Sequence, residues 1–236
     1  MRVVNWNIER RAPQSWQSVS LMEEIDELAP DVICLTEAWR QSAEPLGGFS
    51  ISANGVAWSD QHPDERKVLL WSRQPWRNVQ VVDGLEVTGS TVTGTTSFGE
   101  TEVRFVGLCI PYHFANPLGQ EPRAKLWSQH ERFLQDLRPY LAQWREEGPV
   151  IVAGDFNRRI PRSWGPKRSY ALLESAFHGY EIPTSGIIDE INDRTIDHVA
   201  FSANVKASRV IGRPAEAADG RRRSDHFGIV VDFEFI

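Results

Sequence analysis

Residues 150–159 read VIVAGDFNRR, a run of small and apolar residues that ends in an acid, an aromatic residue, an amide and two arginines. Strands and cores both disfavour residues such as Asp155 and Asn157. A Gly-Asp pair is ordinary turn chemistry, so the polar residues could simply mark the point where the chain leaves a sheet. On a strand-like backbone, however, residues two apart project from one face, which would bring the two side chains together for a common task.

Other predicted strands also end in polar or proton-handling side chains. These residues are Asn7 after the strand 2–8, Glu37 at the end of DVICLTEAW (31–39), His113 after RFVGLCIP (104–111), Asp197 in TIDHVAF (195–201) and SDH (224–226) before the last strand. Each one alone is typical of a solvated loop, but the whole series predicts a cleft at one end of packed sheets. Hard oxygen donors of this kind suit Mg²⁺ or Mn²⁺, whereas the cysteines and paired histidines that zinc prefers are missing from the series.

Length and composition predict a single domain over residues 1–236, because 41% hydrophobic residues among 236 supply a large core. A net charge of −6 argues against a protein that binds nucleic acid or anionic lipid through its overall charge. Cys34 and Cys109 lie inside apolar runs and are expected to be buried, which suits a reducing compartment. Since no signal-like or membrane-spanning segment is visible, we expect a cytoplasmic protein that does not bind membranes.

Hydrophobic periodicity predicts more strands than helices. Apolar positions three apart between Ser15 and Leu28 predict an amphipathic helix that ends before Pro30. A second helix is expected over 122–147, kinked or split by Pro139, and a short third one over 169–177. The remaining expected strands are 68–72, 79–82, 91–96, 102–110, 196–202, 205–211 and 227–235, the middle four forming a largely antiparallel meander.

The motifs, taken in order, resemble those of the endonuclease/exonuclease/phosphatase superfamily, which includes deoxyribonuclease I-like and exonuclease III-like enzymes. The resemblance covers residues 2–233 and is carried by VVNWNIE, PDVICLTEAW, IPYHFAN, VIVAGDFN, TIDHVAFS and SDHFGIVVDF. It implies an α/β (α+β) fold, a four-layer sandwich in which two mixed, mostly antiparallel β-sheets pack face to face with helices outside. It also implies an active site at one rim of the sandwich. No obligate protein partner is evident from the sequence.

The resemblance further implies a role for each matched residue. Glu37 would be the main ligand of Mg²⁺ or Mn²⁺, with Asn7 beside it and Asp225 ligating directly, through water or at a second ion. Asp197 would orient His226, which would act as the proton acceptor or as a cation that touches the scissile phosphate. The remaining roles are Asp155 and Asn157 for the attacking water and a phosphate oxygen, and His113 or its neighbour Tyr112 for a further phosphate contact.

Two positions depart from the common family pattern. Thr36 stands where members commonly have Gln, and His198 stands where many have an aromatic residue. Neither change removes a catalytic group, although His198 could alter substrate contacts.

The motifs indicate the reaction more clearly than they indicate which phosphate ester is the substrate. Basic runs at 10–11, 158–168 and 221–223 flank the expected cleft and favour a polyanion, hence a nuclease acting on DNA or RNA. The expected substrate-binding residues are Trp164 for base stacking, Arg123, Arg158 and Tyr112. The alternatives are hydrolysis of small phosphomonoesters, phosphodiesters or lipid head groups, or a catalytically silent phosphate-binding domain. The silent domain is disfavoured because none of the matched ligands or bases is missing.

Overall fold

Two β-sheets form the centre of the computed structural model, which describes residues 1–53, 62–82, 85, 90–115 and 125–236. The first sheet has six strands in the order β10-β11-β1-β2-β4-β3, and the second has five in the order β5-β6-β7-β8-β9. The strands of the first sheet are β1 (Arg2–Asn7), β2 (Val32–Trp39), β3 (Phe49–Ser52), β4 (Glu65–Ser72), β10 (Val205–Arg213) and β11 (Gly228–Phe235). Those of the second are β5 (Arg77–Val81), β6 (Ser90–Phe98), β7 (Thr101–Cys109), β8 (Val150–Asp155) and β9 (Asp197–Phe201).

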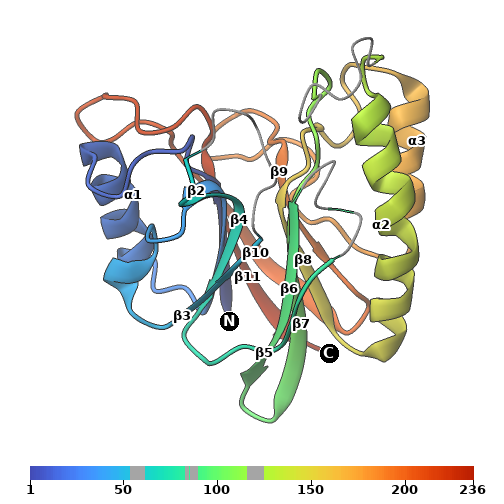
Figure 1. Ribbon diagram of the computed structural model, residues 1–236, viewed down its shortest axis with the longest axis horizontal. Coiled ribbons are helices and arrows are strands. Elements are labelled where there is room, and N and C mark those ends of the chain that lie inside the picture. Colours follow the sequence, from blue (N-terminus) through green and yellow to red (C-terminus); the bar gives the residue numbers. More distant parts are fainter. Residues whose placement is uncertain (54–61, 83–84, 86–89, 116–124) are drawn as a thin grey trace.

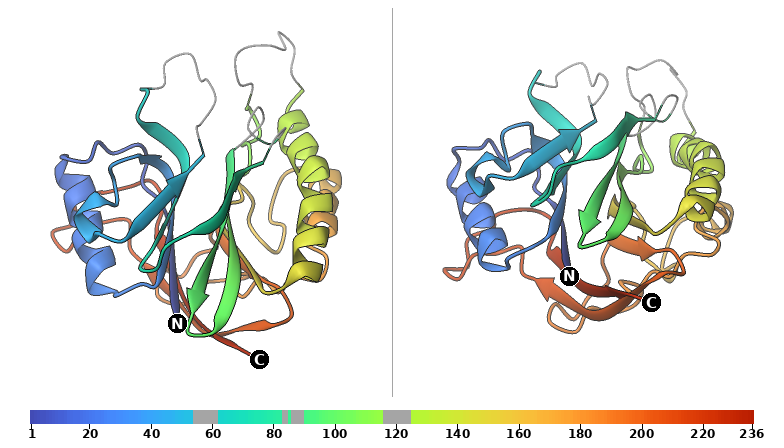
Figure 2. Two further views of the ribbon diagram at one scale, coloured as in Figure 1. Left: turned by 60° about the horizontal axis from the view of Figure 1, so that its bottom comes forward. Right: turned by 90° about the horizontal axis from the view of Figure 1, so that it is seen from below.

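Helices cover the outer faces of both sheets, as Figure 1 and the two turned views of Figure 2 show. Helix α1 (Trp16–Glu27) lies on the first sheet, and α2 (Ser128–Glu147) and α3 (Lys167–Ala176) lie on the second. Each sheet contains one parallel pair, β1–β2 or β7–β8, while the other neighbouring strands run antiparallel. The predicted four-layer sandwich of two mixed, mostly antiparallel sheets is therefore confirmed.

Strand β1 shows how the layers are encoded in the sequence. Its residues alternate between two cores, because Val3 belongs to the apolar cluster between the sheets whereas Val4 and Trp6 pack with α1. Residues 3–7 are all buried, so the strand carries apolar residues on both faces instead of alternating with exposed polar ones. Asn5 and Asn7 are its buried polar residues, and the side-chain amide of Asn5 donates to the carbonyls of Gly154 and His198 at 3.0 and 3.1 Å.

Helix α2 begins later than the sequence predicts. It starts at Ser128 instead of residue 122, because Trp127 has a left-handed backbone (φ 72°) that a helix cannot include; residues 122–124 lie outside the described part of the chain. Pro139 lies inside the helix, which continues through it without being split. Strand β4 starts three residues before the expected 68, and the short strand β3 was not expected. Among the described residues, no helix is both long and apolar enough to cross a membrane.

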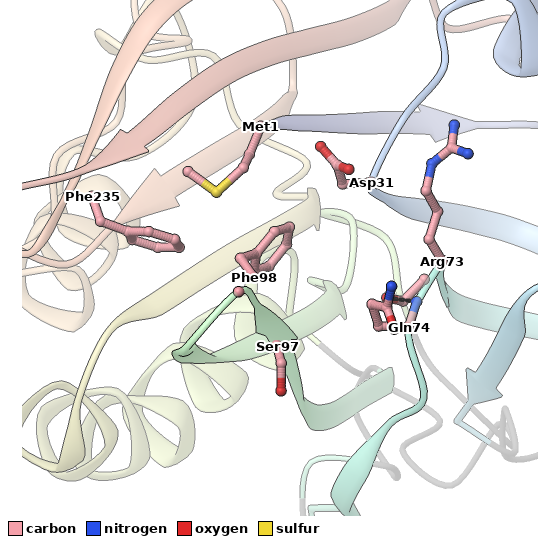
Figure 3. A pocket seen from close by; sticks show the side chains of 9 residues that line it. Met1, Asp31, Arg73, Gln74, Ser97, Phe98 and Phe235 are labelled. Atoms are coloured by element: carbon pink, nitrogen blue, oxygen red, sulfur yellow. Dashed lines mark hydrogen bonds between the residues drawn. The ribbon is translucent and has the colours of Figure 1, made fainter.

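A cavity of about 470 Å³ opens at the end of the sandwich where the chain termini lie (Figure 3). Met1, Phe98 and Phe235 form its apolar lining, and Arg73 and Asp31 form part of its polar lining. Both polar side chains already serve the fold, since Arg73 donates to the carbonyl of Pro30 and Asp31 accepts from the backbone of Arg2. This end lies opposite the one where β1 and β8 terminate in Asn7 and Asp155.

The inter-sheet core offers a direct test of this packing. Phe105 is fully buried between the sheets, where its ring contacts Trp76 and Phe98. Replacing it with Ala is expected to lower the free energy of unfolding by about 3–5 kcal/mol, because the change leaves a cavity that the sheets cannot close. Val79→Ala on the exposed edge strand β5 is the control and should cost less than about 0.5 kcal/mol. Denaturant unfolding measures both, and equal losses would contradict the assigned core.

Candidate active site

The polar residues that end the strands converge at one end of the sandwich. Asn7 is the last residue of β1, Asp155 the last of β8 and Asp197 the first of β9, and the two aspartates are paired across the β8–β9 ladder. The amide of Asn7 donates to Oδ2 of Asp155 over 3.3 Å and so links the two sheets. Asp155, Asp197 and His226 each offer a donor atom, and these atoms lie within 4.8 Å of one another. Side chains from four separate segments thus lie together at this end of the sandwich.

His226 is fixed from both sides. Its Nδ1 lies 2.6 Å from Oδ2 of Asp197, and its backbone carbonyl accepts a hydrogen bond from the indole of Trp6. Its backbone N–H donates to the hydroxyl of Ser224, which in turn donates to the carbonyl of Asn7. The carboxylate on Nδ1 orients the ring so that Nε2 is the nitrogen left for another partner, and it lies 3.9 Å from Oδ1 of Asp225.

The carboxylates around the imidazole shift its charge state. Burial lowers the pKa of His226, but Asp197 first, and then Asp155 and Asp225, outweigh burial and raise that pKa to about 10. Burial, together with the negative charge of Asp197, raises the pKa of Asp155 to about 7. At neutral pH the imidazole is therefore a cation, and Asp155 is the group that can gain or lose a proton.

Asn157 reaches the site by a turn and not by an extended strand. Strand β8 ends at Asp155, and Asn157 has a left-handed backbone (φ 51°), which corrects the expectation that both side chains leave one face of a strand. Its backbone N–H donates to Oδ1 of Asp155 at 2.8 Å, and its side-chain amide donates to the carbonyl of Ile110. Position 154, just before Asp155, requires glycine, because a Cβ there would lie 1.8 Å from the carbonyl oxygen of Leu108. The segment is therefore both a turn and part of the site.

Glu37 is held by two cations. Its Oε1 lies 2.9 Å from Nζ of Lys67, and its Oε2 lies 3.4 Å from Nε of Arg10. Burial raises the pKa of Glu37, but the two cations outweigh burial and lower it below its ordinary value. Lys67 was not expected in the site. A lysine directly before the apolar run VLLW of β4 could have indicated a buried, paired charge.

The side chains expected to contact substrate form an aromatic cluster just beyond β7. His113 stacks on Trp127 at a centroid distance of 5.4 Å and meets the edge of Trp164 at 5.1 Å. Tyr112 and Trp164 are 41% and 47% exposed, so both can receive a ligand. The cluster follows Ile110, whose carbonyl accepts from Asn157, which places the aromatic residues on the same rim as the acids.

Two residues that were expected to contact or influence the substrate are buried and have structural contacts instead. Arg158 is 1% exposed, donates to the carbonyls of Trp164 and Pro166 and covers the ring of Trp127 at 4.3 Å. It therefore supports the aromatic cluster from behind and does not face solvent. His198 is buried between Thr184 and the carbonyl of Arg158, so the expected influence on substrate contacts has no support. Arg123 lies outside the described residues.

The match to a protein family agrees with this geometry. The model of the Endonuclease/Exonuclease/phosphatase family matches residues 4–226. The chain belongs to this family. Its members are hydrolases that act on phosphate esters. A search of curated proteins gave no match.

Solved structures of the family share the fold at low sequence identity. The catalytic domain of human Nocturnin with a bound sulfate anion is 16% identical, with a TM-score of 0.73 over 100% of this chain and 93% of that one. Zebrafish (D. rerio) TDP2 in complex with a single-strand DNA product is 14% identical, with a TM-score of 0.67 over 99% and 98%. The Bacteroides thetaiotaomicron mannosyl-6-phosphatase Bt3783 is 15% identical, with a TM-score of 0.69 over 100% of both chains.

The acids of the site fit a hard divalent cation. Oδ1 of Asp197 is buried and has no hydrogen-bond partner among the described residues, and the raised pKa of Asp155 reflects negative charge packed without full compensation. A cation held by carboxylate and amide oxygens would relieve both. Asp155, Asp197 and His226 form the compact group, whereas Glu37 is not part of any such group in the described ranges.

Most arginines of the basic runs have acidic partners or are buried. Ion pairs join Arg10 to Glu37, Arg11 to Glu9, Arg159 to Asp193, Arg168 to Glu131, Arg221 to Asp219 and Arg223 to Glu24. The rim is consequently less cationic than the sequence runs suggested, because neighbouring acids offset the charge that would attract a polyanion.

The His226–Asp197 contact predicts a pH-dependent stability. Because the folded-state pKa of about 10 exceeds the ordinary value of 6.5, the stabilisation is complete below pH 6.5 and is lost as the pH rises through 10. The difference in unfolding free energy between the wild type and His226→Gln should therefore shrink across this range. Denaturant titrations in a chelator measure it, with the exposed His178→Gln as control. A difference that is constant with pH would refute the charged contact.

Proposed function

We propose that the protein is a Mg²⁺- or Mn²⁺-dependent phosphodiesterase, and specifically a nuclease that cleaves DNA or RNA. The observation that carries the proposal is the Asp197–His226 pair beside the buried Asp155, assembled at one rim with Asn7 and Asn157. A cationic imidazole, a carboxylate that titrates near neutrality and fixed amides are the groups that hydrolysis of a phosphate ester requires.

Asp155 is suited to accept a proton from the attacking water. One of its oxygens receives the amide of Asn7 and the other the backbone N–H of Asn157, so the carboxylate is oriented before substrate binds. Water forms the new P–O bond, its proton passes to Asp155, and the ester P–O bond breaks as the leaving oxygen takes a proton from solvent. The pKa of Asp155 is raised by burial and by the negative charge of Asp197, which makes this carboxylate a stronger base than an exposed one.

His226 is suited to stabilise the phosphate. Asp197 holds Nδ1, and the surrounding carboxylates outweigh burial and keep the ring protonated, so Nε2–H can donate to a non-bridging phosphate oxygen. Of the two roles considered from the sequence, this favours the cation over the proton acceptor. Glu37, Asn7 and Asp225 are the proposed metal ligands, with Asp155 and Asp197 adjacent, and a bound divalent cation would neutralise charge that develops on the phosphoryl and leaving oxygens.

Exposed aromatic rings on the rim support a nucleic acid as the substrate. Tyr112, Phe114 and Trp164 surround His113 with 41%, 62% and 47% of their surfaces exposed, and rings of this kind stack on bases. The structural similarity to TDP2 with its single-strand DNA product is consistent with this choice.

Hydrolysis of a small phosphate ester is the second candidate. It is favoured by the ion-paired arginines, which leave less positive charge for a polymer backbone, and by the similarity to a mannosyl-6-phosphatase.

Substitutions in the proposed machinery should abolish most activity. Glu37→Gln, Asp155→Asn and His226→Gln are each expected to lower kcat at least about a hundredfold, the scale of removing a general base or a charge stabiliser. The exposed Asp136→Asn on α2 is the matched control and should retain wild-type kcat. EDTA should stop hydrolysis, and Mg²⁺ or Mn²⁺ should restore it. Full activity in chelator would rule out the metal-dependent reaction.

Substrate panels separate the two candidates. With Mg²⁺ present, the nuclease proposal expects cleavage of single-stranded DNA, RNA or plasmid in preference to phosphomonoesters. Trp164→Ala should raise KM for an oligonucleotide about tenfold, since stacking contributes roughly 1–3 kcal/mol per base. Trp16→Ala on α1, another partly exposed tryptophan, is the control. Cleavage of monoesters alone would replace the nuclease proposal by the second candidate.

A further inference from the structure

Lys67 brings a positive charge into the site from the first sheet. Its side chain is 11% exposed, and its ammonium lies 2.9 Å from Oε1 of Glu37. Burial lowers the pKa of Lys67, but the carboxylate of Glu37 raises it and the net shift is upward, so the ammonium is charged. Lys67 lies on β4, which pairs with β2, the strand that carries Glu37.

The two cations on Glu37 differ in how easily they can leave. Arg10 lies 3.4 Å away with 47% of its side chain exposed, so water can replace the carboxylate as its partner at little cost. Lys67 is largely enclosed, with 11% of its side chain exposed, so moving its ammonium away from Glu37 costs more than moving an exposed side chain. The charges of Lys67, Arg10 and His226 also offset most of those of Glu37, Asp155, Asp197 and Asp225 before any metal binds.

We propose that Lys67 is a resident cation of the active site that competes with the divalent metal for the carboxylate of Glu37. The inference rests on the proposed metal-dependent function and adds a residue that sets its metal affinity. Lys67 neutralises Glu37 when no metal is bound there, and a metal that binds Glu37 must either displace the ammonium from Oε1 or share the carboxylate with it against the repulsion of the two positive charges. Lys67 is thus a positioning residue that keeps the metal affinity of the site low.

The test is the affinity for Mn²⁺, measured from the free-ion signal in electron paramagnetic resonance without substrate. Lys67→Met should bind Mn²⁺ at least about tenfold more tightly than the wild type, because the competing charge is gone. Lys67→Arg keeps the charge and should keep the weak affinity. Arg10→Gln removes the exposed partner and should change the affinity much less, and Lys206→Met on β10 controls for the loss of one positive charge elsewhere. Lys67→Gln replaces Lys67→Met should the latter fail to fold.

The increase in Mn²⁺ affinity of Lys67→Met must depend on Glu37. Adding Glu37→Gln to Lys67→Met should abolish the tighter binding; if the tight site survives in the double variant, the inference is overturned. Unchanged or weaker Mn²⁺ binding in Lys67→Met also overturns it, and metal-dependent hydrolysis by the wild type would then leave the proposed function standing. Hydrolysis that is unaffected by chelator, with no Mn²⁺ bound by any variant, overturns both.

Discussion

The buried side chain of Asn5 joins the two sheets in the alignment on which the candidate active site depends. A buried amide N–H is costly unless it finds an acceptor, and the Nδ2 of Asn5 finds two on β8 and β9 of the opposite sheet, the carbonyls of Gly154 and His198. Asn7 lies two residues further along the same face of β1 and reaches the carboxylate of Asp155. The strand ends that carry the acids are thereby brought together by a hydrogen bond deep in the core.

Elements whose signal is local could be predicted from the sequence. The apolar spacing of α1 and the buried runs of β1, β2 and β8 gave their positions closely, while the pairing of the sheets came from the family resemblance and not from periodicity. The start of α2 could not be predicted, because it depends on the left-handed backbone of Trp127, which packs against His113. Such a conformation follows from a contact with a distant segment and leaves no pattern in neighbouring residues.

The sequence predicted which residues lie together in the candidate site more completely than it predicted the ion pairs among them. Strand-end polar residues identified the group formed by Asp155, Asp197 and His226, and the order of the motifs supported it. The ion pair between Glu37 and Lys67 could not be predicted. It joins the neighbouring strands β2 and β4, and the register of these strands is set by the whole fold and not by the local sequence. The net charge around the runs of arginine could not be predicted either. A run shows where positive charge lies in the sequence, but it does not show which acid forms an ion pair with each arginine in the fold.

The direction of β1 and β11 has a practical consequence. Met1 and Ile236 lie at the end of the sandwich away from Asn7 and His226, as Figure 1 shows for the two termini. Peptide joined to either terminus would leave the molecule on the side remote from the candidate active site. Affinity tags, surface anchors and fusion partners can therefore be attached at both ends while the rim with Asn7 and His226 stays uncovered.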